Sequence, residues 1–384
     1  MSLPDPDFMK IPFNKPYFTG REAYHVAAAG ATGKISGNGI YTGKCHTFFS
    51  KRYGFEKVLL TTSCTDALEM SALLARIELG DEVIMPSFTF VSTANAFVLR
   101  GAKIVFADSS AENPNINVNT IESLITSKTK AIVVVHYAGI ACDMDKVMEL
   151  AARYKLFVIE DAAQAIDSYY KGRALGSIGN MAAFSFHETK NISCGEGGML
   201  VVNDMDLAPR AEIIWEKGTN RAAFYRGEVD KYGWVDVGSS FLPSDLAAAY
   251  LFGQLDKLDE IQNKRKAIFD SYQNSLMLLQ KSGDLQLPVI PDYASQNGHL
   301  YYLVTNSPGE RDKLLRHLNQ KGIQAVFHYL PLHLSQFYKD KYSGLPLSQA
   351  ERYAACLLRL PFFYELTEDE IADIADMVFL FYKG

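Results

Sequence analysis

The sequence lacks the cysteine patterns that mark disulfide scaffolds and zinc sites. Its five cysteines, Cys45, Cys64, Cys142, Cys194 and Cys356, are scattered, and no two of them form a CxxC pair. An odd count with this spacing argues against a disulfide framework and against a cysteine zinc site. We therefore expect a protein of a reducing compartment that holds no metal.

Long apolar runs and an excess of basic residues are also absent. No stretch approaches the roughly 18 uninterrupted apolar residues of a membrane span. The first residues, MSLPDPDFMK, lack the basic and apolar regions of a signal peptide, and Met9 is a candidate natural start. The 384 residues include 44 acidic and 38 basic side chains, which gives a net charge of −6. We expect a soluble cytoplasmic protein that binds neither nucleic acid nor membranes.

Several familiar nucleotide-binding and metalloprotease motifs are missing too. Residues 37–45, GNGIYTGKC, resemble a Walker A loop, but the glycine spacing differs and no Ser or Thr follows the lysine. No GxGxxG follows the first expected strand, and no HExxH occurs. These absences disfavour a P-loop NTPase, a dinucleotide enzyme and a zinc metalloprotease.

The chain does contain, from about residue 55, a regular alternation of short apolar runs with helical patterns. This pattern predicts helices over 67–79 and 144–153, and strands over 57–61, 82–85, 103–107, 130–136, 156–160, 182–186 and 199–203. Continuous β-branched runs are typical of strands buried on both faces. We therefore predict a mostly parallel sheet covered by helices, with ligands at the carboxyl ends of its strands.

The pattern changes near residue 245. One long helical stretch is predicted over 245–276, followed by strands over 299–304 and 324–329 and an amphipathic helix over 368–382. These elements predict a large domain over residues 9–250 and a smaller α/β domain over residues 251–384.

Polar and aromatic residues follow the expected strands where ligands would bind. Residues 61–66, TTSCTD, lie between a strand and a helix, so their hydroxyls and free N–H groups suit a phosphate. A plain N-cap by Ser63 or Thr65 is the commoner meaning of such a segment. Phe90, after the next strand, could stack on a flat ring, although a phenylalanine is more often part of a core.

Two charged residues at strand ends carry the sharper signal. Asp161 ends a buried strand, so its carboxylate needs a cation, a metal or a protonated ring nitrogen, unless it forms a structural ion pair or a helix cap. Lys190 follows Ser185 and precedes the glycine-rich segment 194–198, which suits a Schiff-base lysine, although most lysines lie on the surface. Taken together, a helix start suited to phosphate, a stacking aromatic, a strand-end Asp and a lysine match the needs of pyridoxal phosphate.

Longer blocks carry a family resemblance. They are residues 81–95 (DEVIMPSFTFVSTAN), 160–164 (EDAAQ) and 185–191 (SFHETKN). With these blocks, the chain from Ile11 onward resembles the DegT/DnrJ/EryC1/StrS sugar aminotransferases. The resemblance implies the pyridoxal-phosphate-dependent transferase fold type I, an α/β fold whose large domain has a mostly parallel mixed sheet between helices. It also implies a homodimer with active sites at the subunit interface.

The resemblance implies a role for each matching residue. Lys190 would carry the cofactor and move the transferred proton, and Asp161 would pair with the pyridine nitrogen. Phe90 would stack on the ring, and Gln164 would contact the ring or its phenolic oxygen. The phosphate would be held by Ser63, Cys64, Thr65 and Ser185. Many relatives add an Asn of the partner subunit to this phosphate, whereas this chain has Leu242 at the matching position.

Three further segments resemble one branch of the family. They are residues 216–221 (EKGTNR), 229–234 (VDKYGW) and 326–333 (VFHYLPLH). That branch aminates dTDP-4-keto-6-deoxy-D-glucose to dTDP-4-amino-4,6-dideoxy-D-galactose, with glutamate as the expected donor. Arg221, His328 and Tyr329 are the candidate substrate residues. The alternatives are another keto sugar, 3-keto or UDP-linked, and a non-enzymatic cofactor-binding sensor.

Overall fold

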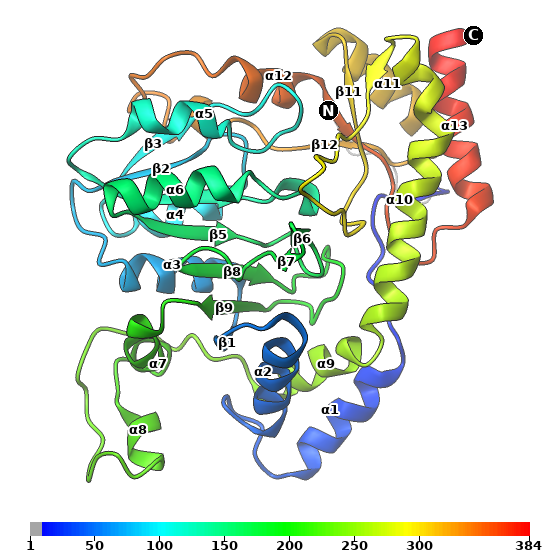
Figure 1. The fold of residues 1–384 in the computed structure, drawn as a ribbon. Helices are drawn as coiled ribbons and strands as arrows, with labels where there is room; N and C mark the ends of the chain where they lie inside the picture. Colours follow the sequence, from blue (N-terminus) through cyan, green and yellow to red (C-terminus); the bar gives the residue numbers. More distant parts are fainter. Residues whose placement is uncertain (1–9) are drawn as a thin grey trace.

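The structure is a computed structural model that describes residues 10–384, so the candidate start Met9 lies outside the described part. A seven-stranded sheet lies at its centre, in the order β1-β9-β8-β5-β4-β2-β3 (Figure 1). Its strands are β1 (Lys57–Thr61), β2 (Glu82–Pro86), β3 (Lys103–Ala107), β4 (Thr129–Val135), β5 (Phe157–Asp161), β8 (Met181–Ser185) and β9 (Gly198–Val202). β9 runs antiparallel to β1 and β8, and the other neighbours are parallel. The predicted mostly parallel sheet is confirmed, and each of its strands was predicted to within one residue.

Alternate residues of these strands enter different cores, because successive side chains of a strand point to opposite faces. In β4, Ile132 and Val134 pack into one core, and Ala131 and Val133 into the other. The first core is covered by α2 (Ile40–Tyr53), α5 (Val118–Ile121), α6 (Met144–Tyr154) and α9 (Asp245–Leu255). The second is covered by α3 (Cys64–Leu74), α4 (Val91–Val98), α7 (Ala208–Trp215) and α12 (Ser348–Cys356). Burial on both faces explains why the strand sequences are continuously apolar.

A second sheet follows later in the chain, beside the helices α10, α11 and α13 (Figure 1). Its antiparallel strands have the order β10-β11-β13-β12 and are β10 (Leu285–Gln286), β11 (Tyr302–Thr305), β12 (Val326–Phe327) and β13 (Leu357–Arg359). With α10 (Leu258–Lys281), α11 (Pro308–Gln320) and α13 (Glu368–Lys383), they enclose a third core. Four further elements belong to neither sheet: α1 (Arg21–Ala31), α8 (Arg221–Tyr225), and β6 (Tyr169–Tyr170) and β7 (Arg173–Ala174), which form a hairpin.

The prediction of a single continuous helix over 245–276 is wrong. The chain forms two helices, α9 and α10, because Lys257 leaves the helical conformation at φ −119° and ψ 12°. At this break the Asp256 carboxylate contacts α1, where it lies 2.7 Å from His25 Nε2. The domain boundary predicted at residue 250 falls inside α9 and stays a prediction.

Among residues 10–384, no helix combines the length and the apolar character that crossing a membrane requires. The cytoplasmic location expected from the sequence stays a prediction.

Candidate active site

The carboxyl ends of β5 and β8, the start of α3 and the strand β12 surround one cavity of about 770 Å³. Ten of the eleven predicted site residues line it: Ser63, Cys64, Thr65, Phe90, Asp161, Gln164, Ser185, Lys190, His328 and Tyr329. The eleventh, Arg221, does not line this cavity. It lies exposed on α8, where its guanidinium donates to the Tyr225 hydroxyl at 3.0 Å. α8 lies far from β12 and the second sheet (Figure 1).

Lys190 lies in the tight loop after β8, where its backbone N–H donates to His187 O at 2.9 Å. Burial lowers the pKa of its amine, because desolvation penalises the charged form. The nearby Arg359 adds to this lowering, while Cys64 and Asp161 act against it. A lysine with a depressed pKa has a larger neutral, nucleophilic fraction at neutral pH.

Asp161, at the end of β5, holds a buried carboxylate with polar but uncharged contacts. Its Oδ2 accepts from the Thr93 hydroxyl at 2.7 Å, and its Oδ1 accepts from the Ala163 N–H at 3.2 Å. Within residues 10–384 no cationic group forms an ion pair with it, and burial raises its pKa. A protonated nitrogen brought into the cavity would supply the cation that this carboxylate lacks.

The start of α3 combines the two roles that its sequence allowed. Ser63 is the N-cap, and its hydroxyl accepts from the Asp66 N–H at 3.1 Å. The hydroxyl of Thr65 donates to Ser92 Oγ at 2.8 Å, and both residues line the cavity. The first turn of this 11-residue helix therefore faces the cavity with the positive end of its dipole, as an anion site requires.

Gly198 of β9 allows this helix start to lie close to the sheet. A Cβ at Gly198 would stand 2.3 Å from the Ser63 carbonyl carbon and 2.4 Å from the Cys64 nitrogen. No side chain fits at that distance, so the position must be glycine for the loop to keep its place.

Aromatic and amide groups complete the wall. The Phe90 side chain lines the cavity and is 55% exposed, and its ring centroid lies 6.1 Å from that of Tyr329. Gln164 Oε1 accepts from the Ala138 N–H at 2.7 Å, and its Nε2 donates to the Tyr329 hydroxyl at 3.0 Å. The His328 ring stacks on Tyr329 at 3.6 Å. The bond from Ala138 fixes which end of the Gln164 amide is the oxygen, because a backbone N–H can only donate.

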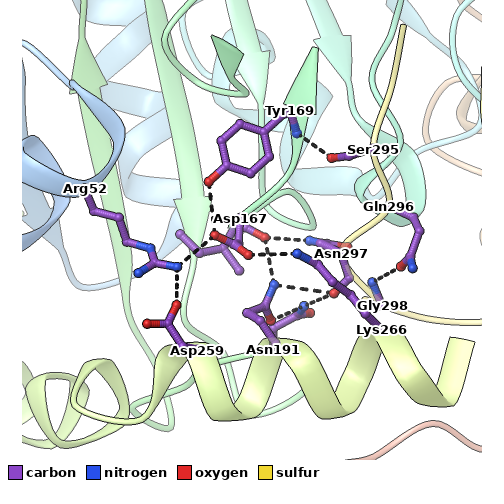
Figure 2. A network of polar contacts seen from close by, with 12 residues as sticks. Arg52, Asp167, Tyr169, Asn191, Asp259, Lys266, Ser295, Gln296, Asn297 and Gly298 are labelled. Atoms are coloured by element: carbon purple, nitrogen blue, oxygen red, sulfur yellow. Dashed lines mark hydrogen bonds and ion pairs between the residues drawn. The ribbon is translucent and has the colours of Figure 1, made fainter. Parts of the chain in front are cut away.

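A buried network joins the loop of Lys190 to other parts of the wall, and Figure 2 shows its members Asn191 and Asn297. Asn191 donates to Asn297 O at 2.9 Å and accepts from His299 Nδ1 at 2.8 Å. Asn297 in turn donates to Gln164 O at 2.8 Å. The network therefore couples the positions of Lys190 and Gln164.

Asn297 also donates to Ile166 O at 2.8 Å, and the next residue, Asp167, is 7% exposed. Its carboxylate lies 3.2 Å from Arg52 of α2 and 3.1 Å from Lys266 of α10, and it accepts from the Tyr169 hydroxyl at 3.2 Å (Figure 2). These ion pairs tie the long helix α10 to the wall behind the cavity.

The sequence motifs did not identify four residues of the site: Thr93, Asn191, His299 and Arg359. The sequence does contain one indication of Arg359, because its charge interrupts the apolar run Leu357–Leu360. Thr93, Asn191 and His299 left none, because their contacts join segments far apart in the chain.

The residues present fit pyridoxal phosphate. The exposed ring of Phe90 suits its ring, the start of α3 suits its phosphate, and Asp161 suits its ring nitrogen. The amine of Lys190 is the nucleophile that its aldehyde requires. Without the cofactor, the buried Asp161 carboxylate has no ion-pair partner among residues 10–384.

Comparisons with known proteins agree with this site. Residues 18–379 match the model of the DegT/DnrJ/EryC1/StrS aminotransferase family. The chain is 32% identical to the spore coat polysaccharide biosynthesis protein SpsC of Bacillus subtilis, over 97% of each chain. DesV of S. venezuelae, solved in complex with a ketimine intermediate, is 29% identical with a TM-score of 0.88, over 97% of this chain and 99% of DesV. Spr1654 of Streptococcus pneumoniae, in its PLP-form, is 25% identical with a TM-score of 0.88, over 97% and 99%. The chain thus belongs to the DegT/DnrJ/EryC1/StrS aminotransferase family and is a pyridoxal-phosphate-dependent sugar aminotransferase with fold type I.

Proposed function

We propose that this enzyme transfers the amino group of glutamate to dTDP-4-keto-6-deoxy-D-glucose and forms dTDP-4-amino-4,6-dideoxy-D-galactose. One observation carries the aminotransferase chemistry: the Lys190 amine lines the same cavity as the Asp161 carboxylate, which forms no ion pair within residues 10–384. The choice of sugar rests on the resemblance of residues 216–221, 229–234 and 326–333 to one branch of the family.

We assign the cofactor residues as follows. Pyridoxal phosphate, when bound, supplies an aldehyde that accepts the amino group and a ring that delocalises negative charge. Lys190 holds the cofactor and is the base and acid that moves a proton from the donor α-carbon. Asp161 keeps the ring nitrogen protonated, Phe90 stacks on the ring and Gln164 contacts it. The phosphate is held by Ser63, Cys64, Thr65 and Ser185.

The depressed pKa of Lys190 suits both of its tasks. A lowered pKa increases the neutral fraction of the amine, which can attack a carbonyl carbon and can accept a proton once the amine is released. The amide of Gln164 and the ring of Tyr329 are held by their mutual hydrogen bond, so the wall beside Lys190 is set before substrate enters.

Two residues, His328 and Tyr329, are assigned to the sugar. They follow β12, line the cavity and stack on one another, so they present one rigid surface. Burial lowers the pKa of His328 well below its ordinary value, so its imidazole is neutral. The His328 Nδ1 contacts the Tyr137 hydroxyl at 2.5 Å, which fixes its ring.

We further propose a homodimer in which Arg221 serves the site of the partner subunit. Arg221 lies on an exposed segment away from its own cavity, together with Trp234, which is 83% exposed, and Val235, which is 54% exposed. A second copy of the chain would cover these apolar side chains and bring the cation to a substrate diphosphate.

The test is incubation of the loaded enzyme with glutamate and a panel of keto sugars, with mass and NMR readout. We expect one amine at C4 of the dTDP sugar, in the galacto configuration, and no product with Lys190→Ala. A 3-amino or UDP-linked product would identify the alternative substrate. A cofactor absorption band that does not respond to any amino donor would identify a sensor.

A further inference from the structure

Arg359 is a cation in the wall of the active-site cavity to which the site described so far gives no task. It is the last residue of β13, between Leu358 and Leu360, which are both fully buried. Its side chain lines the same cavity as Lys190. A strand that packs apolar residues on both sides of an arginine holds the guanidinium in a fixed place.

The guanidinium is only partly satisfied by the protein. Its Nη2 donates to Phe327 O at 3.2 Å, and its carbon lies 4.7 Å from the centroid of the Phe13 ring. Its Nε is buried and has no hydrogen-bond partner among residues 10–384. Within residues 10–384, no carboxylate forms an ion pair with Arg359. A buried, charged donor without an acceptor is costly, so an acceptor from outside the chain is expected.

A second buried arginine shows how this chain satisfies a purely structural guanidinium. Arg265 donates through Nε to Gly298 O and through Nη2 to His299 O, both at 2.8 Å. Its carbon also lies 4.9 Å from an aromatic ring, that of Phe362. The two arginines therefore share the aromatic contact, but Arg359 lacks the second acceptor and faces the cavity.

The free donors of Arg359 suit a carboxylate. The two terminal nitrogens of a guanidinium, Nη1 and Nη2, lie side by side and can match the two oxygens of one carboxylate. Nη2 carries two protons, of which the carbonyl of Phe327 takes one. Nη1 forms no hydrogen bond within residues 10–384 and, unlike Nε, is not a buried atom, so its protons and the second proton of Nη2 remain for a ligand.

The position of Arg359 favours an anion close to the reacting amine. Its charge lies near enough to Lys190 to help lower the pKa of that amine. In an α-amino acid the carboxylate and the transferred amine share one carbon. In a nucleotide sugar the diphosphate is separated from a 4-keto carbon by the sugar ring.

We propose that Arg359 binds the α-carboxylate of the amino donor and so selects α-amino acids over other amines. The proposal rests on the aminotransferase function proposed above. It adds a donor-specificity residue that is separate from the sugar residues His328 and Tyr329.

The test compares two amino donors in the first half-reaction under single-turnover conditions. The change in cofactor absorption reports the rate. L-Glutamate carries the α-carboxylate, and 4-aminobutyrate lacks it. Arg359→Gln is expected to lower the rate with glutamate by about 10- to 100-fold, the range of a hydrogen bond to a charged group. Its rate with 4-aminobutyrate and its second half-reaction with the keto sugar should change less than about threefold, within the cost of an ordinary surface change. Arg352→Gln, which removes a cation of α12 whose Nη2 bonds Gln286 at 2.8 Å, is the matched control and should keep the wild-type donor ratio.

A readout without turnover accompanies these rates. α-Methylglutamate, which has no α-proton, is titrated against the loaded enzyme, and Arg359→Gln should weaken its binding by the same factor. A normal donor ratio in Arg359→Gln would overturn the proposal. So would a loss confined to the keto-sugar step, which would assign Arg359 to the diphosphate.

The experiment distinguishes a wrong choice of amino donor from a wrong role for Arg359. If the wild-type enzyme does not react with glutamate, the donor assignment is wrong. The same comparison is then made between alanine and ethylamine. An unchanged ratio in Arg359→Gln again overturns the role of Arg359.

Discussion

Replacing Asp161 with asparagine tests the pairing of this carboxylate with the cofactor nitrogen. Asparagine keeps the size and can still accept the hydrogen bond from Thr93 or from the Ala163 N–H. It cannot supply the negative charge. Removing one partner of a buried ion pair costs about 3–5 kcal/mol. At about 1.4 kcal/mol per factor of ten, kcat should fall by about 10²–10⁴.

The same variant should not lose folding stability without the cofactor. Burial raises the pKa of Asp161, so the folded chain holds this proton more tightly than the unfolded chain does. The contribution of a group with a raised pKa is present at acidic pH and is lost as the pH rises through its folded value. Asparagine does not titrate. The cofactor-free variant should therefore become more stable relative to wild type as the pH rises from the acidic range to neutrality.

The assays are steady-state transamination of the loaded proteins and thermal unfolding of the cofactor-free proteins at two pH values. Asp145→Asn is the control, because it removes an exposed carboxylate that pairs with Lys171 at 2.6 Å. Its kcat should match wild type. If Asp161→Asn keeps more than about a tenth of the wild-type kcat, a loss below about 1.4 kcal/mol, the pairing with the ring nitrogen is refuted.

Three further predictions concern the walls and the subunit arrangement. Gly198→Ala should weaken cofactor binding by at least about tenfold, since the added methyl displaces Ser63 at the phosphate end. Equal cofactor dissociation constants for the variant and the wild type in a spectrophotometric titration would contradict this prediction. Asn191→Ala should lower the free energy of unfolding by about 1–3 kcal/mol, because its buried partners lose their hydrogen bonds; denaturant titration measures this, and an unchanged midpoint would refute it. Mixing Lys190→Ala with Arg221→Ala subunits should restore up to about a quarter of the activity if each site uses both chains, whereas an inactive mixture of confirmed heterodimers would exclude the shared site.

The central sheet could be predicted closely because burial on both faces makes each strand a continuous apolar run. Position along such strands also predicted Asp161 and Lys190, since both follow strand ends that meet at one edge of the sheet. The break between α9 and α10 could not be predicted in this way. Leu255 and Leu258 on either side of it are both buried, so the apolar pattern continues across the change of direction.

Contacts between distant segments account for the rest of what the sequence did not predict. Asn191 meets His299 across more than a hundred residues, and only the folded chain shows that the pair holds the loop of Lys190. Arg359 is similar, because a charge in an apolar strand indicates a special site but not which cavity it faces. The motif around Arg221 was recognised, yet it lies outside the cavity of its own chain.

The function proposed here requires that the amine of Lys190 holds the cofactor opposite Asp161. Borohydride reduction of the loaded enzyme, followed by proteolysis and peptide mass analysis, shows which lysine carries the cofactor. We expect the reduced cofactor mass on the peptide that contains Lys190, and none on the Lys190→Ala protein. Cofactor mass on another lysine, with Lys190 unmodified, would contradict it.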